Sequence, residues 1–118
     1  MNKYKNQGTT VDGIKFDSKR EAARYAELIL LLRAGKIRNL KLQPQFTLQE
    51  SFKTPQGERV RAVVYIADFS YERATEPDAS GTVHWIPIVE DTKGVRTQAY
   101  KLKKRLMQGK FGVEVQEI

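Results

Sequence analysis

The strongest constraint on this chain is a run of strand-forming residues that ends in two acids and a lysine. Trp85-Ile86-Pro87-Ile88-Val89 is largely apolar, and Glu90-Asp91-Thr92-Lys93-Gly94 follows directly. Side chains alternate between the two faces of a strand, so Asp91 and Lys93 share one face and Glu90 and Thr92 the other. An acid and a base at the end of an apolar strand are costly to bury unless they are paired or bind a metal. The stretch is therefore either a surface ion pair or a functional site.

A second acid, Asp68, lies near the end of another apolar run. Residues 59–72 predict one long strand whose centre, residues 62–67, is apolar on both faces, as is typical of a central strand. Asp68 is either a hydrogen-bonded residue that helps to end this strand or part of a site, since Phe69 and Tyr71 continue the strand pattern beyond it. After a polar loop at 73–82, residues 83–91 predict the partner strand of an antiparallel hairpin. Both aspartates then come late in their strands.

A third acid, Glu21, lies on the first predicted helix. Ser18 and Glu21 have the spacing of a capping box, and Gly35 supplies a stop, so we expect a helix that ends at about residue 34. The core-facing stripe of this helix comprises Glu21, Tyr25, Leu28 and Leu32. The Glu21 carboxylate either folds back on the Ser18 amide or points inward towards a metal.

The second predicted helix is basic. It runs from Thr97, as the N-cap, to about Gln108, and we expect its core-facing residues to be Ala99, Leu102 and Leu106. Its other side chains include Gln98, Lys101, Lys104 and Arg105. Most basic runs are solvated helix faces. This helix, however, begins just after the acidic strand end, so its basic face would flank a site there.

Turns and shorter strands complete the expected order of elements. Asp12-Gly13 predicts a turn within residues 11–16, and Thr54-Pro55-Gln56-Gly57 predicts another. Residues 37–49 predict a strand in which Pro44 marks an edge or a bulge. Gly109 and Gly112 are expected to bracket a turn before a last strand at 111–118.

Composition excludes several classes of function. The chain has 118 residues, 40% of them hydrophobic, which suits one folded domain at 11–118 after a flexible basic tail at 1–10. There is no cysteine and a single histidine, His84, so disulfide frameworks, thiolate metal sites and multi-histidine zinc sites are excluded. No organic cofactor is expected.

Charge and hydropathy indicate where the chain acts and on what. No apolar run is long enough to span a bilayer, and the polar N-terminus lacks the apolar region of a signal peptide. We therefore expect a soluble cytoplasmic protein with no membrane partner. A net charge of +7 on so small a chain favours a polyanionic partner, with nucleic acid first.

The ordered set of acids resembles the PD-(D/E)XK nuclease superfamily. Asp91-Thr92-Lys93 matches its acid-x-lysine, Asp68 matches its lone aspartate, and Glu21 matches the first-helix glutamate of Holliday-junction-resolvase-like members. Lys15-Phe16-Asp17-Ser18-Lys19-Arg20-Glu21 and Val89-Glu90-Asp91-Thr92-Lys93-Gly94 resemble small phage-encoded proteins of that superfamily. Two departures are Ala67 in place of the proline before Asp68, and Asp91 in place of glutamate with Glu90 beside it. The register of the second acid is thus open, and strand alternation favours Asp91.

The resemblance implies a fold and a chemistry. The fold would be α/β (α+β), a restriction-endonuclease-like core with a mixed central sheet of about four strands in the order αβββαβ and two flanking helices. The activity would be that of a DNA endonuclease that uses Mg²⁺, with Mn²⁺ as a substitute, because oxygen ligands suit these cations over zinc. Asp68, Asp91, the Thr92 carbonyl and Glu21 would hold the metal, and Lys93 would hold the attacking water or the phosphate oxygens.

The same resemblance assigns DNA contacts and a setting. Gln98 and Lys101 would contact the backbone beside the cut, and Lys104 and Arg105 would add salt-dependent affinity for phosphates. Branched DNA such as a Holliday junction is one substrate class; its resolution needs two cuts and hence a homodimer. The protein would act in the cytoplasm of a bacterial host and be encoded by a phage or prophage. The alternatives are a non-catalytic nucleic-acid-binding module and a phage replication or packaging accessory protein with its acids in surface ion pairs.

Overall fold

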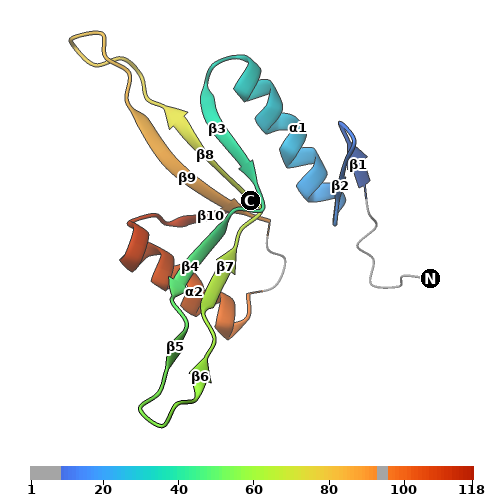
Figure 1. The fold of residues 1–118 in the computed structure, drawn as a ribbon. Helices are drawn as coiled ribbons and strands as arrows, with labels where there is room; N and C mark the ends of the chain where they lie inside the picture. The colour runs from blue at the N-terminus through green and yellow to red at the C-terminus, as the bar shows by residue number, and fades with distance from the viewer. Residues whose placement is uncertain (1–8, 93–95) are drawn as a thin grey trace. The chain divides into compact units, whose positions relative to one another are not determined.

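The computed structural model describes residues 9–92 and 96–118, which form a mixed α and β structure (Figure 1). Two helices lie in this part of the chain, α1 (Lys19–Arg33) and α2 (Gln98–Phe111). A four-stranded mixed sheet has the order β10-β9-β8-β3, with β3 (Ile37–Leu42), β8 (Phe69–Ala74), β9 (Trp85–Asp91) and β10 (Val115–Glu117). The expected class, a mixed sheet of about four strands with two helices, is confirmed at this level. Neither of the two helices described is long and apolar enough to cross a membrane.

The remaining strands pair in twos. They are β1 (Thr9–Val11) with β2 (Ile14–Phe16), β4 (Gln45–Gln49) with β7 (Val63–Ile66), and β5 (Phe52–Lys53) with β6 (Arg59–Val60). The chain divides into two compact units, Met1–Leu40 with Glu72–Ile86, and Lys41–Tyr71 with Pro87–Ile118. Each unit is described by itself, and the assignment of residues 11–118 to one domain stays a prediction.

The first unit begins with the hairpin that the Asp12-Gly13 pair predicts. β1 and β2 are antiparallel with Val11 opposite Ile14, and the two turn residues have φ of 53° and 76°. Positive φ at both central positions matches the twist of the flanking strands, and Asp-Gly adopts it at low cost. Helix α1 packs on this hairpin, and the rings of Phe16 and Tyr25 lie 5.0 Å apart.

Helix α1 begins and ends where its capping residues predict. The Ser18 hydroxyl accepts the Glu21 N–H at 3.1 Å, and Gly35 follows the helix with φ of 74°. The buried residues of α1 are Glu21, Ala22, Tyr25 and Leu28. Leu32, expected on the same stripe, is exposed. That prediction was wrong because the hairpin that packs on α1 lies at its N-terminal end, away from the last turn.

The first unit also holds one end of the main sheet. Arg38 Nε and Asn39 Nδ2 both donate to Oε1 of Glu72, each at 2.7 Å. The Arg38 guanidinium lies 4.3 Å from the centre of the Trp85 ring. These contacts join residues of β3, β8 and β9 through polar side chains.

The second unit contains a bent hairpin where the sequence predicts two continuous strands, the first with an edge position or a bulge at Pro44. The predicted strand 37–49 breaks at Gln43 and Pro44, and the predicted strand 59–72 breaks into β6, β7 and β8. Gln43 has φ of 50°, and its N–H donates to the Asp68 carbonyl at 2.9 Å, while Ala67 N–H donates to the Pro44 carbonyl at 3.2 Å. The two bends are thus bonded to each other. The predicted turn at 54–57 is confirmed by a 2.9 Å bond from Gly57 N–H to the Thr54 carbonyl.

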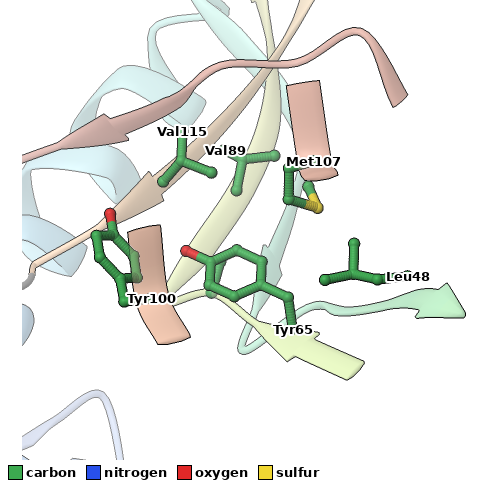
Figure 2. Packing of buried hydrophobic residues seen from close by; sticks show 7 residues of the cluster. Leu48, Tyr65, Val89, Tyr100, Met107 and Val115 are labelled. Carbon is green, nitrogen blue, oxygen red and sulfur yellow. The ribbon is translucent and has the colours of Figure 1, made fainter. Parts of the chain in front are cut away.

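The bend overturns the expectation that residues 62–67 form a central strand buried on both faces. β7 pairs with β4 in a two-stranded ribbon, and Ile66 is 51% exposed. The other face of the ribbon carries Tyr65 and Ala67 into the core of the second unit. This core comprises Leu48, Tyr65, Ala67, Val89, Tyr100, Met107 and Val115, most of which Figure 2 labels.

Helix α2 begins at the predicted cap but presents a different face. The Thr97 hydroxyl accepts the Tyr100 N–H at 3.0 Å, and the helix continues through Gly109 to Gly112, whose φ is 68°. The turn expected between the two glycines is therefore wrong. Tyr100 and Met107 are the buried residues of α2. The predicted core-facing residues are instead exposed: Ala99, Leu102 and Leu106. The last strand is shorter than predicted, because α2 extends to Phe111.

Candidate active site

Glu90 and Asp91 at the end of β9 are both buried, and each carboxylate is hydrogen-bonded to a tyrosine. Each is 1% exposed. The Tyr65 hydroxyl donates to Oδ2 of Asp91, and the Tyr71 hydroxyl donates to Oε2 of Glu90. Asp91 shares its strand face with Val89, which lies in the core beside Tyr65. Strand alternation therefore places the two acids on opposite faces of β9, each with its own tyrosine.

Asp68 lies at the bend between β7 and β8 and is fixed by both its backbone and its side chain. Its N–H donates to the Glu90 carbonyl at 3.1 Å. Its Oδ2 accepts the backbone N–H of Thr92 at 2.7 Å and the Thr92 hydroxyl at 2.6 Å. The bend thus holds Asp68 against the end of β9, where the predicted acid-x-lysine begins.

The Tyr65 hydroxyl is hydrogen-bonded to Asp91 in the buried core of the second unit. Several causes raise the pKa of Tyr65 above its usual 10.0. Burial is the largest, and the hydrogen bond to Asp91 and the charge of Asp91 come next. Tyr100 and Asp68 contribute less. Asp68 reaches the same end of β9 through its bonds to Thr92, the residue after Asp91. The second unit thus places Asp68 beside Thr92 and the end of β9, and the role of these residues as metal ligands stays a prediction.

Glu117 on β10 is the centre of a second polar group, next to Asp91 on the neighbouring strand. β10 runs parallel to β9 with Glu117 opposite Asp91, and the Ile118 N–H donates to the Asp91 carbonyl at 3.0 Å. Glu117 Oε2 accepts the Tyr100 hydroxyl at 2.9 Å. Its two oxygens also pair with Arg96 at 2.7 Å and Lys104 at 3.5 Å. Burial, and then the bond to Glu117, raises the pKa of Tyr100.

The predicted DNA-binding residues of α2 differ in their surroundings. Gln98, Lys101 and Arg105 are exposed. Lys104 is half-buried and paired with Glu117. The exposed residues follow the spacing of one helix face, so they present an amide and two positive charges together.

Lys93 and Glu21 are the two remaining residues of the predicted catalytic set. Lys93 lies outside the described residues. Glu21 is 5% exposed and lies in the first unit, where its N–H donates to Ser18. Its burial agrees with the predicted place of Glu21 on the core-facing stripe of α1, and both alternatives for its carboxylate stay predictions.

Sequence reasoning missed both tyrosines and the role of the Thr92 donors. A signal for Tyr65 was present, since a tyrosine inside an apolar strand must find a partner for its hydroxyl when buried. The sequence did not show which partner, because that depends on the bend at Asp68. Strand alternation predicts the Thr92 side chain on the face opposite Asp91. β9 ends at Asp91, so Thr92 no longer follows this alternation, and its hydroxyl donates to Asp68.

The donor atoms of this group are all oxygen. Asp68, Asp91 and the Thr92 carbonyl are the ligand types that Mg²⁺ takes, usually through one or two carboxylates and retained water. No cluster of three or more histidine, cysteine, aspartate or glutamate side chains within residues 9–92 and 96–118 is arranged to hold a metal ion. The oxygen donors of the second unit therefore fit the chemistry of Mg²⁺. They comprise two carboxylates, Asp68 and Asp91, and one backbone carbonyl.

Comparison with known proteins places the chain in a family. The profile of the family described as "Protein of unknown function (DUF1064)" matches residues 1–117, so the chain belongs to that family. No curated protein and no solved structure matches the chain.

Proposed function

We propose that this member of the DUF1064 family is a metal-dependent DNA endonuclease with a restriction-endonuclease-like core. The observation that carries the proposal is that the Asp68 carboxylate is hydrogen-bonded to Thr92, the residue that directly follows Asp91 and precedes Lys93. Two ionised carboxylates that lie near each other repel unless something offsets their charge. A bound divalent cation would offset it, and the resemblance to PD-(D/E)XK nucleases gives the same residues that role.

Each residue then has a defined task. Bound Mg²⁺ would act as a Lewis acid and lower the pKa of the attacking water. Asp68 would offer Oδ1, because the hydrogen bonds from Thr92 both reach Oδ2. Asp91 and the Thr92 carbonyl would complete the donors of the second unit. Lys93 would hold the water or the phosphate oxygens.

The chain's charge and the exposed face of α2 support DNA as the partner. The net charge is +7, and Lys101 and Arg105 are exposed with Gln98 on the same helix. These side chains would contact the phosphate backbone and position it without reading sequence. Lys104 would contribute less than the exposed pair, because Glu117 already neutralises it.

Branched DNA is the substrate class that we propose first. Cutting two strands of a four-way junction symmetrically needs two active sites, so this form of the proposal includes a homodimer. The substrate class rests on the Holliday-junction-resolvase-like position of Glu21.

The test is a cleavage assay with three substrates: supercoiled plasmid, linear duplex and a four-way junction. Each is incubated with Mg²⁺, Mn²⁺ or EDTA, beside Asp68→Ala and Lys93→Ala. We expect cutting with either cation, none with EDTA, and loss of cutting in both variants. Absence of metal-dependent cutting on every substrate would contradict the proposal. Binding without cutting would favour a non-catalytic nucleic-acid-binding module. A protein that neither binds nor cuts DNA would favour the phage accessory protein.

A further inference from the structure

Tyr65 is held rigidly in the core of the second unit. Tyr65 is 3% exposed, and its ring contacts those of Phe46 and Tyr100, with both centroids 6.4 Å away. The Phe46 ring is nearly parallel to it, at 23°. The Tyr65 ring lies within this core cluster (Figure 2). Its hydroxyl donates to Oδ2 of Asp91.

We infer that Tyr65 is a positioning residue that orients the Asp91 carboxylate for a divalent cation. The inference rests on the proposed metal site. A carboxylate can rotate about its Cβ–Cγ bond, and one fixed hydrogen bond to Oδ2 sets the plane in which Oδ1 lies. Hydrogen-bond partners of this kind keep metal ligands in place, and their loss usually weakens metal affinity.

The chain contains a matched pair that separates positioning from stability. Tyr71 and Glu90 form the same kind of buried bond, in the same unit, one residue away along β9. Asp68 contributes to the electrostatic environment of Tyr65. A purely structural role predicts that the two tyrosines behave alike. A positioning role predicts that only Tyr65 affects the cation.

The experiment compares Tyr65→Phe with Tyr71→Phe, each of which keeps the ring and removes the hydroxyl. Mn²⁺ binding to the full chain is measured by isothermal titration calorimetry, and urea midpoints are measured for both variants. We expect Tyr65→Phe to weaken Mn²⁺ affinity by about 10–100-fold. Tyr71→Phe should bind Mn²⁺ like the wild type while losing stability to a comparable extent.

A second measurement uses the wild type alone. Tyrosine residues labelled with ¹³C at Cζ are observed by NMR during a Mg²⁺ titration, with the resonances assigned through their correlation to the sequentially assigned backbone. We expect the Tyr65 resonance to shift with saturation and the Tyr71 resonance to stay in place. Equal shifts, or none at Tyr65, would overturn the inference.

The outcomes distinguish this inference from the proposed function. If the wild type binds Mn²⁺ and Tyr65→Phe binds it equally well, the role of Tyr65 is wrong and the nuclease proposal stands. If the wild type binds Mn²⁺ but cuts no DNA, the nuclease proposal fails, and the comparison of the two tyrosines still decides the role of Tyr65. If the wild type binds no Mn²⁺, both are wrong.

Discussion

Thr92 donates two hydrogen bonds to a single oxygen of Asp68, one from its backbone N–H at 2.7 Å and one from its hydroxyl at 2.6 Å. The pair ties the residue after β9 to the bend before β8. Only the hydroxyl can be removed by substitution, so its share of the interaction can be measured separately from that of the backbone.

Thr92→Val should lower the free energy of unfolding by about 1 kcal/mol. A hydrogen bond to a charged group contributes somewhat more than a neutral one, and partial exposure of this site reduces the effect. Urea denaturation measures the change, with Thr92→Ser as the control that keeps the hydroxyl. Equal midpoints for the valine and serine variants would contradict the importance of this bond.

Met107→Ala should be much more destabilising than Leu106→Ala. Met107 is fully buried in the core of the second unit, whereas Leu106 is 41% exposed. Truncating a buried methionine costs about 2–5 kcal/mol, and we expect less than about 1 kcal/mol at Leu106. Thermal or urea unfolding gives the comparison. The reverse order would show that α2 presents the face that its leucines predict.

The protein should lose stability as the pH is lowered into the acid range, because Glu117 becomes protonated there. The hydrogen bond from Tyr100, supported by the charges of Lys104 and Arg96 and opposed by burial, holds the pKa of Glu117 below its usual 4.5. A carboxyl group with a lowered pKa stabilises the folded state above the unfolded pKa, and this stabilisation is lost as pH falls through the folded pKa. Glu117→Gln should therefore flatten the loss of stability below about pH 4.5.

The check is a set of urea midpoints between pH 3 and pH 7 for the wild type and Glu117→Gln. Glu114→Gln is the control, because Glu114 is an exposed carboxylate three residues earlier. Identical pH profiles for the wild type and Glu117→Gln would count against this network.

Local signals in the sequence predicted much of the fold. Ser18, Thr97 and the Asp12-Gly13 pair act within a few residues of themselves, and each caps or turns the chain where predicted. The breaks at Pro44 and Asp68 depend on which strands pair, so an alternating pattern continues across them unchanged. The face of α2 was misjudged because leucines are more hydrophobic than Tyr100 and Met107, yet the latter meet the core.

The candidate site was predicted as a set of acids, and its supporting contacts were not. Two residues late in the strands of an antiparallel hairpin lie at opposite ends, and the structure brings Asp68 to Asp91 because the bend places Asp68 at the start of β8, beside the end of β9. The partners of those acids, Tyr65 and Thr92, are determined by the bend and by the end of β9. Both are tertiary features that no single stretch of sequence encodes.

The most direct test compares Asp91→Asn with Glu90→Gln in Mg²⁺-dependent DNA cutting. Both substitutions keep the shape of the side chain and a hydrogen-bond acceptor for the tyrosine, and both positions are 1% exposed. If Asp91 holds the metal, Asp91→Asn should lose at least about 100-fold in rate, because a lost ligand removes several kcal/mol of transition-state stabilisation. Glu90→Gln should cut within a few-fold of the wild type. Loss of cutting in Glu90→Gln with full activity in Asp91→Asn, or full activity in both, would contradict the proposed site.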